Sequence, residues 1–300
     1  MARFRDGKRE VPALKHGAFM LSKGLRISAV SLVLAITPVF AQVSAAPAPA
    51  SSTDVITPRQ HAPRRVYPGR PARVIDNVTV EDSTNWSGYA VEGTSFTKAL
   101  GSWTVPTVNC TKTPNTYAAF WVGIDGWTSS TVEQTGTDSD CDGKTASYYA
   151  WYEFYPNPSE LISSVPVSPG NHISASVTYS GTEFTITLTN ESTGKSYSKS
   201  SKVSGAKRTS AEWIAEAPCC TNSGGILPLS DFGTVDLGDD YTGISGTNDA
   251  TDSSVSGAIG AFGSNVFESI MVNGSSGADE AVPSGLSSDG SSFTVTWDSE

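Results

Sequence analysis

Apolar and polar residues alternate over many short stretches after residue 79, and this two-residue period predicts β-strands rather than helices. Glycine, serine, asparagine and aspartate separate the stretches, as turns between strands require. More than 200 residues of this pattern predict one all-β domain made of two large packed sheets. The expected strands are Asn85–Val91, Lys98–Val105, Ala118–Ile124, Ser147–Tyr155, His172–Tyr179, Glu183–Asn190, Ser196–Lys202, Ala211–Ala217 and Ser292–Trp297.

Four of the most apolar stretches contain acidic or amide side chains. They are FWVGIDG (Phe120–Gly126), VEQTG (Val132–Gly136), YYAWYEFYP (Tyr148–Pro156) and AEWIAEAP (Ala211–Pro218). An ionised carboxylate in an apolar strand is costly unless it is paired or kept neutral. We therefore expect the chemistry of the protein among Asp125, Gln134, Glu153, Glu212 and Glu216.

Side chains point to alternate faces along a strand, so parity indicates which of these groups lie together. Glu153 shares its face with two aromatic residues, and Glu216 shares its face with Glu212, whereas Gln134 points away from Glu133. A face that carries carboxylates between aromatic side chains predicts the concave side of a curved sheet. The residues placed on this face are Trp151, Glu153, Tyr155, Glu212, Ile214 and Glu216.

The first 45 residues have the order of a secretory signal peptide. Positive charges end with Lys23 and Arg26, an apolar run of 17 residues extends from Ile27 to Val43, and small residues at 43–45 provide a cleavage site. A membrane anchor is the alternative, but this run is short and contains Pro38. We therefore expect a signal peptide at 1–45, a secreted protein, and no membrane association after cleavage.

Residues 46–78 form a leader that is rich in proline, alanine and serine and has little apolar periodicity. Residues 1–78 hold 12 Lys/Arg and 4 Asp/Glu, whereas residues 79–300 hold 8 and 26, so a leader of net charge +8 precedes a body of net charge −18. Opposite charge attracts such a leader to the body. We expect 46–78 to be a pro-segment that is later removed, with a plain linker as the alternative, and 79–300 to be the functional domain.

The acidic body excludes nucleic acid as a partner, because nucleic-acid binding requires a basic face. An excess of carboxylates fits work at low pH, where protonation relieves their mutual repulsion. No spacing of Cys and His suggests a metal site, and nothing in the sequence calls for a cofactor. We expect a monomer.

The four cysteines of an exported chain are expected to form disulfides. Cys110 and Cys141 are expected to pair across the loops that flank FWVGIDG. The adjacent Cys219 and Cys220 either pair with each other or one of them pairs elsewhere, and the sequence leaves this open.

Nucleophilic catalysis by a Ser-His-Asp triad is disfavoured, because His172 is the single histidine of the body and has no neighbouring motif. Carboxylates and amides remain. Amide hydrolysis without a covalent intermediate needs a base that later returns its proton, and donors for the oxyanion. Glu216 and Gln134 are candidates for these two tasks.

Seven segments, in the same order and with similar spacing, resemble those of the glutamic peptidases, also called eqolisins. The resemblance covers nearly all of the chain from Thr79 onward. The segments are NWSGY (Asn85–Tyr89), TVP (Thr104–Pro106), WVGIDG (Trp121–Gly126), QTG (Gln134–Gly136), AWYEFYP (Ala150–Pro156), AEWIAEAP (Ala211–Pro218) and LPLSDFGTV (Leu227–Val235).

This resemblance implies a bent sandwich of two antiparallel sheets of about seven strands each, similar to concanavalin or jelly-roll folds. It implies a zymogen of an acid endopeptidase that resists pepstatin-type inhibitors and cuts polypeptide substrates. Gln134 and Glu216 match the family's catalytic glutamine and glutamate. Glu212 matches the first acid of that glutamate's segment and is not expected to be catalytic. Supporting or substrate-binding residues are Asp125, Glu153, Trp86, Trp121 and Tyr155.

Three positions depart from the family pattern. Glu133 replaces an apolar residue but is expected to point away from the site, so that its effect is small. Tyr149 stands where the family often has an aspartate, which removes one supporting carboxylate. Ala217 replaces a common acid, and Cys219 and Cys220 follow it, so the loop after Glu216 is expected to differ.

Two other classes of protein fit the same aromatic face. A β-sandwich glycoside hydrolase could use Glu153 and Glu216 as its carboxylate pair, with Gln134 dispensable. A carbohydrate- or peptide-binding module without catalysis could use the same groove. The order of the seven segments favours the peptidase over both alternatives.

Overall fold

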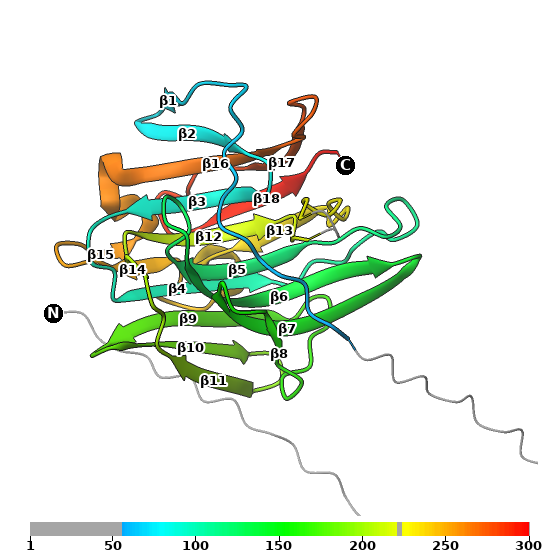
Figure 1. Ribbon diagram of the computed structural model, residues 1–300, viewed down its shortest axis with the longest axis horizontal. Helices are drawn as coiled ribbons and strands as arrows, with labels where there is room; N and C mark the ends of the chain where they lie inside the picture. The colour runs from blue at the N-terminus through cyan, green and yellow to red at the C-terminus, as the bar shows by residue number, and fades with distance from the viewer. Residues whose placement is uncertain (1–55, 221–223, 300) are drawn as a thin grey trace, which may run out of the picture. The chain divides into compact units, whose positions relative to one another are not determined.

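The computed structural model describes residues 56–220 and 224–299, so the expected signal peptide and the leader before residue 56 lie outside the described residues. The described chain is almost entirely β-structure (Figure 1). Its strands are β1 (Arg73–Ile75), β2 (Val78–Ser83), β3 (Trp86–Glu92), β4 (Lys98–Thr104), β5 (Ala119–Ile124), β6 (Val132–Asp142), β7 (Thr145–Tyr155), β8 (Glu160–Leu161), β9 (His172–Ser180), β10 (Glu183–Asn190), β11 (Lys195–Ser201), β12 (Ser210–Glu216), β13 (Thr234–Leu237), β14 (Asp249–Thr251), β15 (Ser256–Ala258), β16 (Val266–Val272), β17 (Asp279–Pro283) and β18 (Phe293–Trp297). The helical elements are α1 (Asp239–Thr242) and the 3₁₀-helix η1 (Ile259–Asn265).

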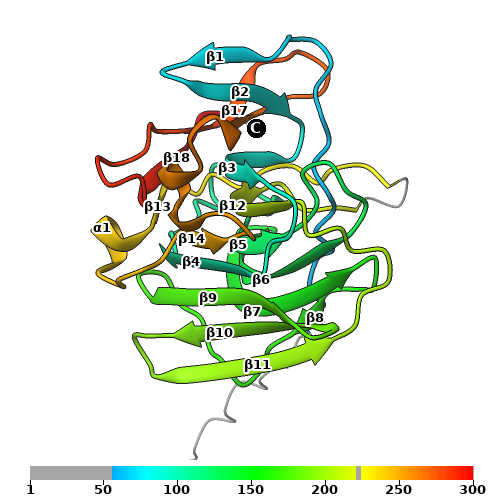
Figure 2. The same cartoon turned by 90° about the vertical axis from the view of Figure 1, so that its left-hand side faces the viewer.

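The first layer is a sheet whose strands follow the order β1-β2-β16-β3-β12-β5-β6-β7-β8. All of these neighbours are antiparallel except β2 and β16. The second layer contains β11, β10, β9 and β4, and β4 pairs further with β13 and β14. Strands β13, β18 and β17 then lead back to β16, which joins the two layers at one side (Figure 2).

The two layers pack face to face and explain the burial of the central strands. Strands β5 and β12 are buried at every position, because one face meets the second layer and the other face is also covered. Strands β9 and β10 instead alternate between buried and partly buried residues, as expected where one face of a sheet meets water. The prediction of an all-β sandwich is confirmed, although hydrogen bonding joins its two layers into one continuous, mainly antiparallel sheet that is not closed into a barrel.

Glycine makes room for large side chains on the outer face of the first layer. This face points away from the second layer, and we call it the covered face because residues 56–72 lie on it. Gly136 of β6 lies between Trp121 of β5 and Trp151 of β7 in the cross-strand register. A Cβ atom there would approach the Phe120 carbonyl oxygen to 2.4 Å and the Trp121 Cβ to 2.6 Å. The glycine of the QTG segment therefore allows two tryptophans to pack across the strand that carries Gln134.

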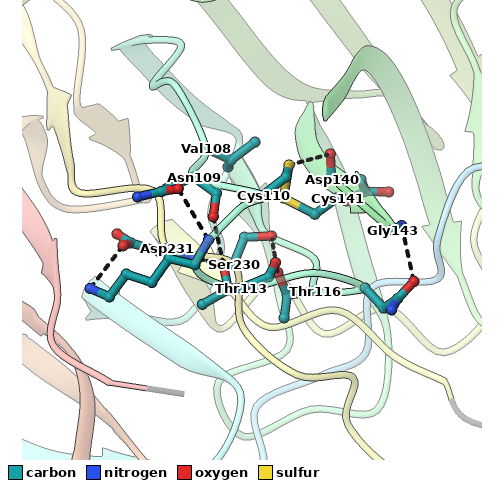
Figure 3. Close-up of a disulfide and its surroundings, with 12 residues drawn as sticks. Val108, Asn109, Cys110, Thr113, Thr116, Asp140, Cys141, Gly143, Ser230 and Asp231 are labelled. Carbon is teal, nitrogen blue, oxygen red and sulfur yellow. Dashed lines mark hydrogen bonds and ion pairs between the residues drawn. A yellow bond between two sulfur atoms is a disulfide. The ribbon is translucent and has the colours of Figure 1, made fainter. Parts of the chain in front are cut away.

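The expected disulfide between Cys110 and Cys141 is present and lies in the loop region drawn in Figure 3. It ties the end of β6 to the loop before β5. Next to it, Thr116 donates hydrogen bonds to the Thr113 carbonyl and the Ser230 hydroxyl. Cys219 and Cys220 pair with each other, which resolves the alternative that the sequence leaves open.

The part of the leader that the structure describes packs on the body. Residues 56–72 run across the outer face of the first layer, and the blue chain in Figure 1 crosses in front of β12, β5 and β6. β1 and β2 then form a hairpin that adds to the sheet through β16. No helix in residues 56–220 and 224–299 is long and apolar enough to cross a membrane.

Candidate active site

The cross-strand register brings the predicted residues of three segments into one region of the covered face. Gln134 of β6 aligns with Glu153 of β7 on one side and with Gly123 of β5 on the other, and Gly123 aligns with Glu212 of β12. Glu216 lies four residues further along β12, on the same face as Glu212. The face assignment made from parity is therefore confirmed for these strands.

Gln134 is completely buried, and its side-chain amide makes two hydrogen bonds of 2.9 Å. One goes to the carboxylate of Glu153, and the other goes to the backbone carbonyl oxygen of His61, a residue of the leader. Glu153 accepts a further hydrogen bond of 3.0 Å from the backbone N–H of His61. Gln134 therefore binds the carbonyl oxygen of His61, and Glu153 binds the N–H of the same residue.

Glu216 is also completely buried, and its Oε2 accepts a hydrogen bond of 2.8 Å from the indole nitrogen of Trp121. Its Oε1 has no hydrogen-bond partner among the described residues. Burial raises the pKa of Glu216 to about 8, although the positive charge of His61 and the Trp121 hydrogen bond act in the opposite direction. With the leader in place, Glu216 is therefore protonated at acid pH.

His61 is completely buried at the centre of this region. Its ring stacks on Trp151 with 3.6 Å between ring centroids and 6° between ring planes. Its Nε2 lies 3.1 Å from Asp138, and its Nδ1 lies 3.6 Å from Glu153. Burial alone would lower the pKa of His61, but Asp138 and Glu153 raise it to about 10, so the ring is an imidazolium held between carboxylates.

A second set of polar groups extends this network toward the end of β6. The hydroxyl oxygen of Tyr149 lies within hydrogen-bond distance of both Asp138, at 2.7 Å, and Asp140, at 2.9 Å. Arg59 of the leader pairs with Asp140 at 3.5 Å. Tyr149 stands where the family often has an aspartate, and its hydroxyl links two aspartates of β6. The region therefore keeps carboxyl groups despite this departure.

The leader is held on the outer face of the first layer by backbone as well as side-chain contacts. We call the part of this face that contacts residues 59–64 the groove. Gln60 exchanges backbone hydrogen bonds of 3.1 and 2.8 Å with Cys219, just after β12. The carbonyl oxygen of Ala62 accepts from the indole nitrogen of Trp86 at 3.1 Å. The backbone N–H of Arg64 donates to Gly126 at 3.1 Å, and its guanidinium lies 3.5 Å from the ring centroid of Trp127.

The predicted supporting residues divide into two groups. Glu153, Trp86 and Trp121 make direct contacts with the leader or with the catalytic candidates, and Tyr155 packs at the edge of the same aromatic cluster. Asp125 does not join them, because its carboxylate accepts backbone N–H groups of Lys207, Arg208 and Thr209 at 2.7 to 3.0 Å. Asp125 therefore anchors the loop before β12.

Two further buried glutamates do not reach the leader's carbonyls. Glu133 points into the space between the layers, as predicted, and burial raises its pKa to about 9. Glu212 lies on the covered face, and burial raises its pKa well above the ordinary value. Burial therefore favours the neutral form of both carboxyl groups. In the described part of the chain, no cluster of His, Cys, Asp and Glu has the arrangement of a metal site.

His61, Asp138 and Asp140 belong to this region but were not among the residues expected from the sequence. The two aspartates could have been predicted from the sequence. The alternation that starts in VEQTG continues to residue 142 and places them on the face of Gln134. His61 is harder to find, since it lies in a segment that lacks apolar periodicity and is buried by contacts with distant strands.

These groups can activate water and stabilise charge on a carbonyl oxygen without a nucleophilic side chain, and together with the fold they define a β-sandwich hydrolase. The pattern of the peptidase A4 family matches residues 84–295. The chain belongs to this family, the glutamic peptidases, and is a glutamic endopeptidase that hydrolyses peptide bonds.

Similar curated proteins and solved structures agree with this assignment. Aspergillopepsin-2 of Aspergillus niger is 31% identical over an alignment of 203 residues. The match covers 59% of this chain and 71% of that protein. Scytalidopepsin B of Scytalidium lignicola is 35% identical over 185 residues, 60% of this chain and 69% of that protein. A crystal structure of scytalido-glutamic peptidase with a transition state analog inhibitor has a TM-score of 0.59 and 28% identity, covering 72% of this chain and 98% of the other.

Proposed function

We propose that this chain is the exported precursor of an acid endopeptidase in which Glu216 and Gln134 carry out the reaction. In this proposal residues 1–45 are a signal peptide, 46–78 are a pro-segment that is removed, and 79–300 are a secreted, monomeric catalytic domain. The observation that supports it most strongly is the hydrogen bond of 2.9 Å from the Gln134 amide to a peptide carbonyl oxygen.

The proposed reaction on other polypeptides starts after the leader has left the site. Water then reaches Glu216, and its pKa falls because burial no longer opposes the charged form. Ionised Glu216 takes a proton from water as the water attacks the scissile carbonyl. Gln134 donates to the developing oxyanion, and Glu216 then transfers its proton to the leaving nitrogen.

Neighbouring groups position this pair. Trp121 holds one oxygen of Glu216 through a hydrogen bond of 2.8 Å, which leaves the other oxygen for water. Glu153 holds the amide of Gln134 at 2.9 Å and orients its second N–H toward the substrate carbonyl. The mechanism assigns no step to Asp125 or Glu212.

The leader has the contacts of an inhibitor. It places His61 against Gln134 and Glu153, and it keeps Glu216 buried and neutral. A precursor in which Glu216 cannot ionise lacks a functioning base and is therefore inactive. We propose that release of this segment in acid converts the zymogen into the active peptidase.

Digestion of an unfolded protein substrate from pH 2 to 7 tests the proposal. The acid-treated protein should cut the substrate only in acid, in the presence of pepstatin and of a chelator. Cleavage that a chelator or pepstatin abolishes would contradict the proposal. So would an oligosaccharide substrate that is cut in place of the protein substrate.

A further inference from the structure

The leader lies in the groove in the manner of a bound peptide. Residues 61–65 contain no regular secondary structure, and Gln60 forms an isolated antiparallel bridge with Cys219. Arg64 is fixed by its backbone N–H to the carbonyl oxygen of Gly126. Backbone pairing of an extended segment is a common way to bind peptides of varied sequence.

The contacts converge on the peptide bond that joins His61 to Ala62. The carbonyl oxygen of His61 accepts from the Gln134 amide at 2.9 Å, and that of Ala62 accepts from Trp86 at 3.1 Å and from Asn85 at 3.4 Å. The peptide groups on both sides of one bond are therefore held, and the carbonyl of that bond meets the proposed oxyanion donor.

We infer that the His61–Ala62 peptide bond is the first bond that this precursor cuts in itself on acidification. The inference rests on the proposed function, because it uses the same pair of residues. It identifies the first substrate of the site as the enzyme's own leader, bound with His61 on the amino side of the cut and Ala62 on the carboxyl side.

The cleavage is a simple hydrolysis. A water oxygen bonds to the carbonyl carbon of His61 while Glu216 takes one of its protons, and Gln134 donates to the carbonyl oxygen. The bond from that carbon to the nitrogen of Ala62 then breaks, and Glu216 returns the proton to this nitrogen. The products are a new carboxyl group on His61 and a new amino group on Ala62.

The bond stays intact in the covered form because Glu216 is buried and protonated there. Acid loosens the leader by neutralising carboxylates that face its cations. The groups that face the imidazolium of His61 are Asp138 of β6, Glu153 of β7 and Glu216 of β12, with Tyr149 behind Asp138, and Arg59 faces Asp140 and Asp142. As these contacts weaken, water enters, and the fraction of molecules in which Glu216 becomes ionised cuts the bond.

The cut has a structural consequence for the groove. His61 becomes the last residue of a fragment that no longer continues into the body, and it can leave with its ring. Its departure uncovers Trp151, Asp138 and Glu153, whereas Ala62 remains joined to the body through β2. Later cuts would then remove the residues from Ala62 onward.

The test is a time course with the purified full-length precursor. The protein is brought from pH 7 to about pH 3.5, and new amino termini are labelled and identified by mass spectrometry at intervals, with an added unfolded substrate in a parallel tube. We expect an amino terminus at Ala62 before any other. Glu216→Gln should produce no new terminus.

Two substitutions of Ala62 give a matched pair. The N–H of Ala62 donates no hydrogen bond to any described residue, so Ala62→Pro removes no hydrogen bond, whereas proline nitrogen makes a poor leaving group in this geometry. Ala62→Pro should slow the first cut at least tenfold, and Ala62→Ser should cut at the rate of the wild type. Circular dichroism and melting of both variants at pH 7 verify that they fold alike.

The outcomes separate this inference from the proposed function. A first new terminus elsewhere, with digestion of the added substrate, overturns the inference and leaves the proposed function standing. Equal rates of cutting in the Ala62→Pro and Ala62→Ser variants also overturn the inference. Absence of both self-cleavage and substrate digestion in the wild type contradicts the proposed function itself.

Discussion

Gln134 donates a side-chain hydrogen bond of 2.9 Å to the backbone carbonyl oxygen of His61, across 73 residues of sequence. The amide therefore already contacts the kind of group that becomes negatively charged when a peptide bond is attacked. Donors placed in advance at a developing oxyanion are among the largest contributions to enzymatic catalysis. This relationship links the leader to the proposed chemistry.

Replacement of Gln134 by alanine removes that donor. We expect Gln134→Ala to lower kcat by roughly 10²–10³-fold, the effect typical of losing one oxyanion donor. KM should change much less, because the interaction strengthens in the transition state. Steady-state kinetics on an acid-activated sample, with melting temperature as a control for folding, checks this. A kcat within threefold of the wild type would exclude the role.

Replacement of His61 tests how the leader is held. His61→Ala removes the stack on Trp151 and the contacts with Asp138 and Glu153. We expect the precursor to cut an added peptide several-fold faster than the wild type at pH 5–6, where latency is still maintained. His172→Ala, which changes a partly buried histidine at the start of β9, is the matched control. Equal latency of the two variants would show that His61 does not hold the leader.

The stability of the precursor should fall as the pH rises from acid to alkaline values. Folding raises the pKa of Glu216 to about 8 and that of Glu133 to about 9. Their contribution is fully present below the unfolded pKa of about 4.3 and is lost as the pH rises through these folded values. We expect the melting temperature to fall by several degrees between pH 5 and pH 9.

A single substitution isolates one part of this pH dependence. Glu133→Gln replaces a buried acid on the face that points away from the site with a neutral group of similar size. It should flatten the decline in melting temperature and leave kcat/KM unchanged. Calorimetry across this pH range, with the wild type measured in parallel, provides the comparison. An unchanged slope would mean that Glu133 is not held neutral in the fold.

The hydrogen bond from Trp121 to Glu216 should set the acid limb of activity. Hydrogen bonding favours the ionised carboxylate, so its loss in Trp121→Phe raises the pKa of Glu216. Because the base must be ionised, the acid limb of kcat/KM should move to higher pH in the activated enzyme. Trp86→Phe, which loses a bond to the leader but none to Glu216, should leave that limb in place.

The sequence predicted which side chains share a strand face better than it predicted the contacts of the leader. Two-residue alternation placed Glu153, Glu212 and Glu216 on one face and separated Gln134 from Glu133, because side-chain direction in a strand depends only on local parity. The disulfide between Cys110 and Cys141 also followed from position and export. Strand β6 was predicted only in part, and this hid Asp138 and Asp140.

Contacts that depend on tertiary structure could not be predicted in the same way. Asp125 resembled its neighbours in an apolar segment, yet three backbone N–H groups of a distant loop occupy its carboxylate. His61 lies in a segment with no periodicity, and its burial follows from a groove that exists only when five strands are assembled. The raised pKa of Glu216 also follows from that burial, which depends on tertiary contacts.

The most direct test of the central claim compares two glutamates of one strand. Glu212 and Glu216 lie four residues apart on the same face of β12, and both are completely buried in the precursor. Glu216→Gln and Glu212→Gln are measured on a quenched fluorescent peptide at pH 3–5, after wild-type enzyme has removed the leader and has itself been removed by its affinity tag. The account predicts that Glu216→Gln abolishes turnover while Glu212→Gln retains most of it. Near-normal turnover in Glu216→Gln, or equal losses in both variants, would contradict the assignment of Glu216 as the base.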